Sequence, residues 1–394
     1  MRHKDYESEG VCMTHLFPNY KREPIDLVRG FGNYVEDQTG KEYLDFTSGI
    51  GVNSLGHQHP KLIRALEKQM HLIWHTSNLY SSKLQEDVAK KLANNKNYLA
   101  FFCNSGTEAN EAAIKLARKA TGRSKIISFQ QSFHGRTYGA LSATGQEALH
   151  EGFAPILPDF QYVPFNEIEP LKELVDQDTA AVMIELIQGE GGVLPAEVSF
   201  VQQVAELCKE QGALLIVDEI QTGIGRTGNL YAYEGYGIEP DIFTLAKALG
   251  NGIPVGAMLG KKELKDAFGP GSHGTTFGGN KLALRVAVAV LDIINDPNFL
   301  DKVKQKGDYA LKSLSSLKDS SDKVLDVRGQ GLMIGVQLKD QDTLNATVSN
   351  LQKKGLLVLK AGNNTLRLLP PLTIEQDELE KGIGMIKVEL LDKK

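Results

Sequence analysis

Apolar runs alternate with helix-like segments through the middle of the chain. Between residues 84 and 248, short runs of apolar residues predict strands, and segments whose apolar residues recur three and four positions apart predict helices. The predicted strands are residues 99–103, 125–129, 180–186, 213–218 and 241–245, and the clearest helices between them are 108–120 and 199–210. This alternation predicts an α/β fold with right-handed crossovers and a mostly parallel sheet flanked by helices.

The pattern changes toward both ends of the chain, where it predicts a smaller α+β unit. Residues 33–36 and 42–46 predict a β-hairpin around a turn at 37–40, followed by a helix at 61–72. Beyond residue 280 we expect helices at 282–295, 299–317, 343–353 and 374–391, a strand at 331–338, and a hairpin-like pair at 356–360 and 365–369. The expected division is residues 1–45 as an N-terminal segment joining the small domain, 46–287 as the large domain and 288–394 as the small domain.

Length and composition narrow the class of protein. The chain has 394 residues, 41% of them hydrophobic, and a formal net charge of −5. It exceeds the roughly 250–300 residues that one core usually supports, which favours two domains. The mild negative charge offers no field that would gather nucleic acid or an anionic membrane. The three cysteines (Cys12, Cys103 and Cys208) form no CxxC pair, and no signal-like core or membrane-length apolar run occurs, so we expect a soluble cytoplasmic protein.

An acid and a lysine follow two of the predicted strands. Asp218 is the last residue of the predicted strand at 213–218, and Lys247 comes just after the predicted strand at 241–245. Open α/β sheets bind ligands at the carboxyl ends of their strands, and desolvation there would lower the pKa of a lysine and suit it to Schiff-base chemistry. Each residue alone is also typical of a turn, a cap or an exposed side chain.

A short segment between a predicted strand and a predicted helix has the composition of an anion site. Ser105 and Thr107 are residue types that cap helices, and Gly106 allows close approach to the backbone. The free N–H groups at a helix start would suit a phosphate. A plain capped helix would explain the same residues.

Charged and aromatic residues in three other segments are candidates for the same cleft. Phe133, His134 and Arg136 lie within four residues, and arginine is suited to gripping a carboxylate through two hydrogen bonds. Glu190 lies in a glycine-rich segment after the strand at 180–186, and Arg367 lies far along the chain. Solvated surface charges are the alternative explanation for all three charged side chains.

Two other patterns carry little weight. Gly223, Gly225 and Gly228 match the G-x-G-x-x-G pattern, but the residues that follow are poor helix formers, and the dinucleotide fingerprint requires a helix to begin there. His57 and His59 lack the partners of a known metal motif, so we expect no metal site. Two other function classes stay open on these residues. One is a nicotinamide oxidoreductase built on the glycine pattern, and the other is a ligand-binding protein without catalysis.

Taken together, these residues resemble the class III aminotransferases, which depend on pyridoxal 5′-phosphate and have fold type I. The resemblance covers nearly the whole chain, and its specificity comes from the order and spacing of many segments. These include the segments around His57, Ser105–Gly106–Thr107, Phe133–His134–Gly135–Arg136, Asp218–Gln221, Lys247, Thr275–Asn280 and Arg367.

The resemblance implies a role for each candidate residue. Lys247 would hold the cofactor covalently and later move a proton, and Asp218 would pair with the pyridine nitrogen. The other implied cofactor-binding residues are Ser105, Gly106, Thr107, Phe133, His134 and Gln221, with Thr276 reaching over from the second subunit of a homodimer. The implied substrate-binding residues are Arg136, Glu190, Thr275 and Arg367, with Glu190 neutralising Arg367 when the substrate has no second carboxylate.

Within the family the chain most resembles the acetylornithine aminotransferases. The similar stretches are residues 49–52, 141–146 and 152–158. Ornithine aminotransferases usually carry a tyrosine where Ile50 falls, which argues against free ornithine. The resemblance implies amino transfer from N2-acetylornithine to 2-oxoglutarate, with ornithine, succinylornithine and 4-aminobutyrate as alternative amine donors.

Overall fold

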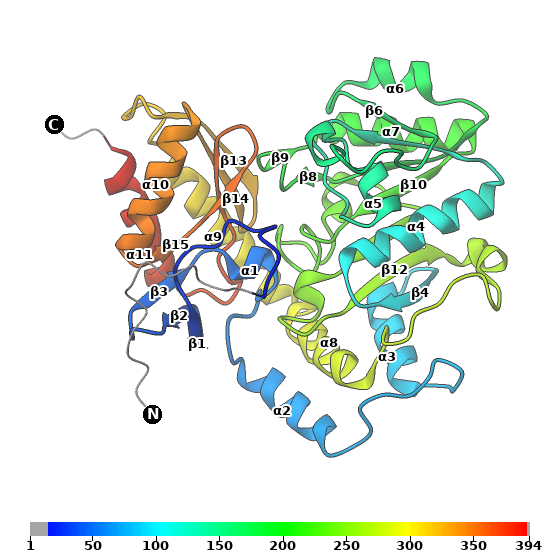
Figure 1. The fold of residues 1–394 in the computed structure, drawn as a ribbon, viewed down its shortest axis with the longest axis horizontal. Helices are drawn as coiled ribbons and strands as arrows, with labels where there is room; N and C mark the ends of the chain where they lie inside the picture. Colours follow the sequence, from blue (N-terminus) through cyan, green and yellow to red (C-terminus); the bar gives the residue numbers. More distant parts are fainter. Residues whose placement is uncertain (1–14, 392–394) are drawn as a thin grey trace.

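A seven-stranded sheet forms the centre of the larger lobe of the molecule (Figure 1). In this computed structural model, which describes residues 15–391, the strand order is β4 (Tyr98–Cys103), β12 (Gly256–Lys261), β11 (Ile242–Leu245), β10 (Leu214–Asp218), β7 (Thr179–Ile184), β5 (Lys125–Phe129) and β6 (Phe160–Val163). Only β12 runs antiparallel to its neighbours. All five strands predicted from the apolar runs lie in this sheet, which confirms the mostly parallel α/β architecture.

Helices cover this sheet because strand and helix alternate along the chain. Helix α4 (Gly106–Thr121) begins at Ser105, whose Oγ accepts a hydrogen bond from the backbone N–H of Glu108. It ends at Gly122, whose φ of +68° suits a residue without a side chain. Helix α7 (Val198–Gln211) ends in the same way at Gly212. The shorter helices α5 (Tyr138–Ala143) and α6 (Ile168–Leu174) complete the α/β layers on this side of the molecule.

The smaller lobe contains an antiparallel sheet that sequence reasoning described only in part. Its order is β13 (Val324–Gln330), β14 (Met333–Leu338), β17 (Thr365–Leu368) and β16 (Leu359–Ala361), packed with helices α9 (Pro297–Ser315), α10 (Gln341–Lys353) and α11 (Gln376–Leu390). The expected hairpin of 356–360 with 365–369 is wrong in its first half. Residues Leu356–Leu357 form β15 and pair instead with the N-terminal strand β3 (Glu42–Asp45), while only β16 pairs with β17.

The N-terminal strands lie against the C-terminal lobe (Figure 1). Strands β1 (Leu27–Phe31), β2 (Tyr34–Asp37) and β3 form a meander, and the parallel pairing of β3 with β15 joins the two ends of the chain in one sheet. The chain then enters a short helical turn, α1 (Ser48–Gly51), and continues into α2 (Pro60–Met70) and α3 (Lys83–Ala93).

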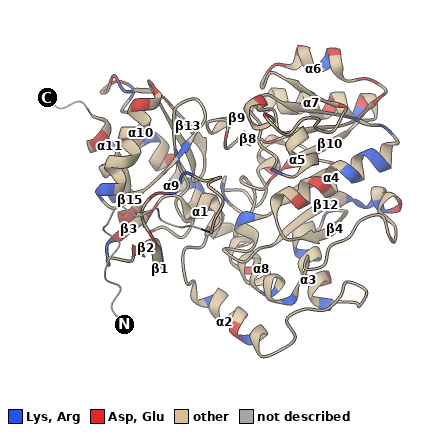
Figure 2. Ribbon diagram, in the orientation of Figure 1, with Lys and Arg blue, Asp and Glu red and all other residues tan. Residues whose placement is uncertain are grey.

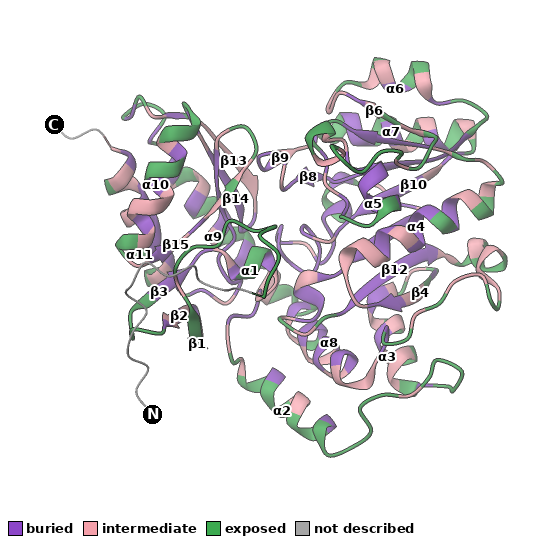
Figure 3. Cartoon of the chain, viewed as in Figure 1, coloured by how far each residue is buried: buried purple, intermediate pink, exposed green. Residues whose placement is uncertain are grey.

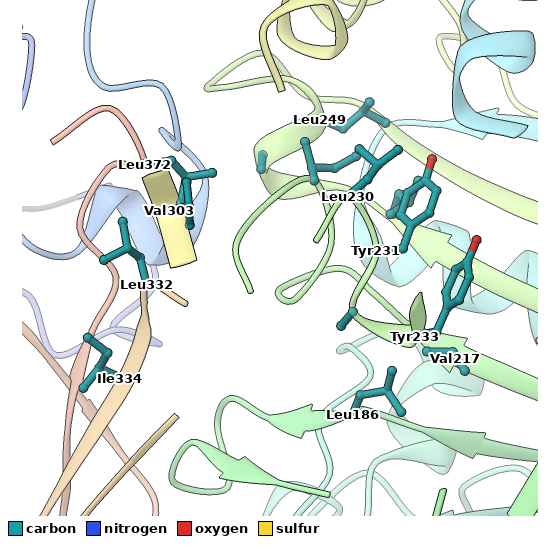
Figure 4. Packing of buried hydrophobic residues seen from close by; sticks show 14 of the residues in the cluster. Leu186, Val217, Leu230, Tyr231, Tyr233, Leu249, Val303, Leu332, Ile334 and Leu372 are labelled. Carbon is teal, nitrogen blue, oxygen red and sulfur yellow. The ribbon is translucent and has the colours of Figure 1, made fainter. Parts of the chain in front are cut away.

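The two lobes share one continuous hydrophobic core. Helix α8 (Lys281–Ile294), which contains the expected domain boundary at 287/288, leads into α9, and buried residues continue from one lobe to the other (Figure 3). Figure 4 shows Leu332 and Leu372 facing the junction from the smaller lobe, and Leu230 and Leu249 on the side of the larger lobe.

A fully buried arginine also joins the lobes. The guanidinium of Arg226 donates from Nη1 to the backbone oxygens of Leu332 and Pro370, and from Nη2 to Ser54 Oγ. Burial lowers the pKa of Arg226 to about 9. Arg226 lies in the glycine pattern at 223–228, which forms turns followed only by a short 3₁₀ helix (Ala232–Tyr236), so the strand–turn–helix of a dinucleotide site is not formed there.

Charged residues of both signs are distributed over the molecule, as the small net charge of −5 suggests. Lysines and arginines are interspersed with acids over both lobes (Figure 2). Between residues 15 and 391, no helix is long and apolar enough to cross a membrane. Cys103 and Cys208 are buried free thiols, and Cys12 lies outside the described residues.

Candidate active site

A cavity of about 460 Å³ opens at the carboxyl ends of the parallel strands in the larger lobe. This is the edge at which open α/β sheets bind their ligands. Most of the residues singled out from the sequence line it, although they come from distant parts of the chain: Ser105, Gly106, Thr107, Phe133, His134, Arg136, Glu190, Asp218, Gln221 and Lys247.

Asp218 is the buried acid of the cavity. Its Oδ2 accepts hydrogen bonds from Asn110 Nδ2 and His134 Nδ1, both at 2.8 Å, and its Oδ1 accepts from the backbone N–H of Ile220 at 3.0 Å. A carboxylate can only accept, so His134 Nδ1 is the donor in this contact. Nε2 of His134 is buried and has no hydrogen-bond partner among the described residues. The carboxylate is therefore held in one orientation, and the His134 ring beside it keeps one buried nitrogen without a partner within residues 15–391.

Lys247 follows β11 in a strained backbone conformation. Its φ of +42° lies in the left-handed region, which is unfavourable for a residue with a side chain. Burial lowers the pKa of the Lys247 amine to about 8, and the nearby Glu190 carboxylate partly opposes that shift. A substantial fraction of this amine is therefore neutral near pH 8, as a nucleophile or a base requires.

The start of helix α4 forms one wall of the cavity. Ser105 occupies the N-cap position, and the first N–H groups of the helix at Gly106 and Thr107 have no partners within the helix. A Cβ at Gly106 would come within 2.8 Å of the Ile220 side chain, so the backbone approaches its neighbours closely here. The helix start and its dipole favour a negatively charged group at this wall.

The loop with Phe133 is held by a buried acid that sequence reasoning missed. Glu185 comes directly after β7, and its Oε2 accepts a hydrogen bond from the backbone N–H of Phe133 at 2.9 Å. Its Oε1 accepts from the N–H of Gly189 at 3.3 Å. Burial raises the pKa of Glu185 to about 7. Its signal in the sequence is the same as that of Asp218, an acid directly after an apolar strand.

Arg136 and Phe133 face each other at the cavity. The Arg136 guanidinium carbon lies 5.5 Å from the centre of the Phe133 ring, within the range of a cation–π contact. Arg136 is exposed to solvent, unlike Arg367. Its position at the cavity edge suits it to meet a ligand that enters from outside.

Arg367 lies on β17 in the smaller lobe and reaches the cavity residues of the larger lobe. Its Nη1 donates to Glu190 Oε1 at 2.7 Å and to Gln221 Oε1 at 3.1 Å. The Arg367 side chain is 2% exposed, whereas that of Glu190 is 31% exposed. The carboxylate therefore borders solvent, whereas the arginine is enclosed.

Thr275 and Thr276 lie apart from the other candidate residues. They line a second cavity of about 450 Å³ together with Asn104 and Glu108, and Thr275 Oγ1 accepts a hydrogen bond from Asn104 Nδ2 at 3.4 Å. Thr276 is exposed. Within a single chain, these two threonines do not meet Lys247 or Asp218.

Comparisons with known proteins agree on one family. The profile of the family Aminotransferase class-III matches residues 17–390. The chain is 54% identical to an acetylornithine aminotransferase of Listeria monocytogenes, over 95% of this chain and 97% of the relative, and 55% identical to that of Streptococcus mutans, over 95% and 98%.

Solved structures with the same fold include two functional types. An ornithine aminotransferase of Toxoplasma gondii, with PLP at partial occupancy at its active site, superposes with a TM-score of 0.91 at 32% identity, covering 96% of this chain and 92% of that one. The N-acetylornithine aminotransferase of Stenotrophomonas maltophilia superposes with a TM-score of 0.82 at 36% identity, covering 94% and 96%.

Proposed function

The chain belongs to the class III aminotransferases, and from this membership we infer that it moves the δ-amino group of N2-acetyl-L-ornithine to 2-oxoglutarate. The products are N-acetyl-L-glutamate 5-semialdehyde and L-glutamate, which makes the reaction a step of arginine biosynthesis. The observation that carries this conclusion is the 54–55% identity to acetylornithine aminotransferases over 95% of the chain. Identity to the ornithine aminotransferase of Toxoplasma gondii is only 32%. The cytoplasm is the expected location.

Class III aminotransferases use pyridoxal 5′-phosphate, and the cavity residues fit this cofactor. The start of helix α4 suits the phosphate, and the buried carboxylate of Asp218 suits a protonated pyridine nitrogen. The buried, unpartnered Nε2 of His134 leaves a polar position for a ligand to satisfy. When bound, the cofactor supplies an electron sink that stabilises negative charge on the reacting carbon of the substrate.

We propose that Lys247 and Asp218 divide the proton handling. Asp218 would hold the proton on the pyridine nitrogen, because Asn110 and His134 fix its carboxylate in place. Lys247 would bind the cofactor covalently at rest. During turnover its neutral amine would take the proton from the substrate carbon, and a pKa near 8 suits this task.

The remaining cavity residues would orient the cofactor. Ser105, Gly106 and Thr107 would hold its phosphate, and Phe133 would stack on its ring. Gln221 would donate a hydrogen bond to the phenolic oxygen of the ring, because its Oε1 already accepts from Arg367 and its amide nitrogen is the donor.

Two arginines would serve the two substrates unequally. We propose that Arg136 grips a carboxylate in both half-reactions, and that Arg367 grips the second carboxylate of glutamate or 2-oxoglutarate. The acylated amine donor brings no carboxylate to Arg367, and a buried, unpaired guanidinium would be costly. The Glu190–Arg367 ion pair, with an N···O distance of 2.7 Å, supports the view that Glu190 neutralises Arg367 in that half-reaction.

Single-turnover rates of the two half-reactions test this assignment. Arg367→Ala should slow the glutamate half-reaction strongly, because loss of a charged partner for a buried group costs roughly 2–5 kcal/mol, and should slow the acetylornithine half-reaction little. Arg136→Ala should slow both. Equal slowing of both halves in Arg367→Ala would contradict the model. Parallel reactions with ornithine and 4-aminobutyrate decide the amine donor, with acetylornithine expected to react fastest.

We also propose a homodimer with shared active sites. Thr276 is exposed beside Phe277, whose ring lies 5.4 Å from that of His75. The segment around His75 also exposes apolar side chains, namely Leu72, Ile73, Trp74, Leu79 and Tyr80. An apolar patch of this kind favours a protein partner. In the dimer, Thr276 would reach the phosphate held by the neighbouring subunit, and Thr275 would contact the substrate there.

A further inference from the structure

Two arginines and a glycine form a row across the antiparallel sheet of the smaller lobe. Arg328 on β13 pairs with Gly335 on β14, and Gly335 pairs with Arg367 on β17. Directly opposite residues of antiparallel strands point to the same face of a sheet. Both guanidinium groups therefore lie on one face, with the side-chain-free Gly335 between them.

This row faces the loop that connects strands β8 (Ile187–Gln188) and β9 (Leu194–Pro195). The small β8–β9 hairpin lies between the two lobes (Figure 1), and its loop, residues 189–193, includes Glu190. The loop thus belongs to the larger lobe by sequence but meets the sheet of the smaller lobe.

Every N–H group of Arg328 has an acceptor. Nε donates to the backbone oxygens of Gly192 (3.2 Å) and Val193 (3.1 Å), and Nη2 donates to Gly192 O at 2.7 Å and to Thr365 Oγ1 at 3.1 Å. Nη1 donates to Gln337 Oε1 at 2.7 Å and to Asp326 Oδ2 at 3.2 Å. Because this planar fork fills all five donor positions, it holds the loop and the sheet in one relative position.

Packing and a backbone hydrogen bond hold the same loop. Val193 is fully buried, and a Cβ at Gly335 would come within 2.9 Å of the Val193 Cβ, so the loop needs a glycine beneath it. At the other end of the loop, the backbone oxygen of Glu190 accepts from the N–H of Gly362 at 2.8 Å. The backbone of the loop is thus held by the smaller lobe, while the Glu190 carboxylate remains partly exposed.

We propose that Arg328 is a positioning residue that keeps Glu190 paired with Arg367, and that it thereby sets the preference between the amine donor and the dicarboxylate substrate. This inference rests on the proposed exchange of Glu190 at Arg367. A fixed loop backbone lets the Glu190 side chain alone move when a dicarboxylate arrives. If the loop is released, Glu190 pairs with Arg367 less of the time, and the free arginine favours dicarboxylates.

Binding of glutarate to the holoenzyme tests this proposal without turnover. Glutarate carries two carboxylates but no amino or keto group, so calorimetry reports its affinity directly. The variants are Arg328→Met, which keeps the apolar stem, Glu190→Ala and the double variant. Asp326→Asn is the matched control, because residue 326 contacts the Arg328 guanidinium but not the loop. Half-reaction rates with glutamate and acetylornithine accompany each measurement.

We expect Arg328→Met to change glutarate affinity and the half-reaction rates only when Glu190 is present. Arg328→Met should tighten glutarate binding roughly 3- to 10-fold and raise the ratio of glutamate to acetylornithine rates, and the double variant should match Glu190→Ala alone. Asp326→Asn should leave both readouts unchanged. If Glu190→Ala changes glutarate binding but Arg328→Met does not, the role of Arg328 is refuted. If Glu190→Ala itself changes neither readout, the proposed exchange at Arg367 fails first.

A second variant covers the case in which Arg328→Met does not fold. Gly335→Ala adds a single methyl group within 2.9 Å of Val193 Cβ and 3.0 Å of Thr365 Cγ2, and should displace the loop while keeping the side chains of both arginines. It should shift glutarate affinity and the rate ratio in the same direction as Arg328→Met. Equal slowing of both half-reactions, with unchanged glutarate affinity, would overturn the proposal.

Discussion

The chemistry of single residues in this site depends on charges that the fold keeps out of water. Lys247 follows a buried strand in a left-handed conformation, and burial brings its pKa down to about 8. The carboxylate of Asp218 is held in one orientation because Asn110 and His134 donate to it. The protonation of Lys247 and the orientation of Asp218 thus both depend on where the fold places these side chains. Substitutions at the two positions are expected to change catalysis without unfolding the protein.

Substitution and pH both test Lys247. Lys247→Ala should abolish transamination while circular dichroism shows an unchanged fold. In the wild-type apoenzyme, only the neutral amine binds the cofactor covalently, so the rate of cofactor loading, followed by absorbance, should rise with pH and level off above about 8. More than trace activity in Lys247→Ala, or a loading rate that still rises steeply above pH 10, would contradict the assignment.

Asp218→Asn should reduce activity far more than it reduces cofactor affinity. An amide cannot supply the charge that keeps the pyridine nitrogen protonated, so half-reaction rates should fall on the order of 10²–10⁴-fold. The cofactor keeps its phosphate contacts, and its affinity, measured by fluorescence titration of the apoenzyme, should change much less. Unchanged half-reaction rates would show that Asp218 is only structural.

Glu219, the neighbour of Asp218, provides a test of stability against pH. It is buried, accepts hydrogen bonds from Thr222 Oγ1 and the N–H of Tyr233, and burial raises its pKa from 4.5 to about 7. Because the folded state binds the proton more tightly than the unfolded state, stability from this group is present below pH 4.5 and is lost as pH rises to about 7.

Glu219→Gln should remove that dependence. The free energy of unfolding of the wild type minus that of the variant, measured with denaturant, should fall between pH 5 and pH 8 by as much as about 3 kcal/mol. The two proteins should also differ in their free energy of unfolding by an amount that does not depend on pH, since glutamine replaces one acceptor oxygen with a donor. A difference that stays constant with pH would mean that Glu219 titrates normally.

At the scale of elements, the site is built from the ends of strands and helices. Asp218 ends strand β10, Glu185 and Lys247 follow strands β7 and β11, and Ser105 is the N-cap of helix α4. A less regular element contributes Val52 to the cavity: Ser48, Gly49, Ile50 and Gly51 all have positive φ, between 46° and 73°, and form a left-handed turn. A hydrogen bond from Ser48 Oγ to the backbone oxygen of Leu369, at 2.7 Å, holds this turn against the smaller lobe.

Two glycine-to-alanine substitutions distinguish an effect on the anion site of helix α4 from an effect on the stability of the whole protein. A methyl group at Gly106 would collide with Ile220, so Gly106→Ala should weaken cofactor affinity and shift the helix start. Gly384 lies inside helix α11 with no heavy atom near its Cβ position, so Gly384→Ala should stabilise the protein by about 0.5–1 kcal/mol. Cofactor titration and thermal unfolding of both variants check the pair; equal cofactor affinity in the two proteins would count against the anion site.

At the scale of the whole molecule, one chain brings together nearly all of the candidate site. The continuous core and Arg226 hold the lobes against each other, so that Arg367 of the smaller lobe reaches Glu190 and Gln221 of the larger lobe. Thr275 and Thr276 are the exceptions, because they line a separate cavity. The proposed dimer accounts for this separation.

Mixing inactive variants tests the shared site. A Lys247→Ala subunit paired with a Thr276→Ala subunit should form heterodimers with one site carrying both lesions and one carrying neither, so activity should recover. In the inverse arrangement, a subunit with both substitutions is mixed with wild type, and each heterodimer site carries one lesion. Heterodimers isolated from the first mixture should be more active than those isolated from the second, which must be separated from fully active wild-type homodimers. Heterodimers that form without recovered activity would reject sharing.

Local pattern was sufficient for the regular part of the fold. The strands β4, β5, β7, β10 and β11 and helices α4 and α7 were predicted because their apolar runs and helical spacing are visible within a few residues. Strand β12 escaped notice because it contains two glycines and is held by pairing with β4 and β11. The split of residues 356–361 between two sheets likewise depends on partners far along the chain.

The sequence by itself determined the family, the cofactor and the identities of the candidate residues, because these follow from residue types in a particular order. The tertiary structure shows the contacts themselves: the Glu190–Arg367 pair, which the family resemblance implied, joins residues 177 positions apart, and Arg328, which no sequence pattern indicated, reaches a loop 136 positions away. Arg328 and the left-handed turn at Ser48–Gly51 could not be found from local pattern. Their roles come from hydrogen bonds and packing between distant segments, and such contacts leave no periodic signal in the residues that make them.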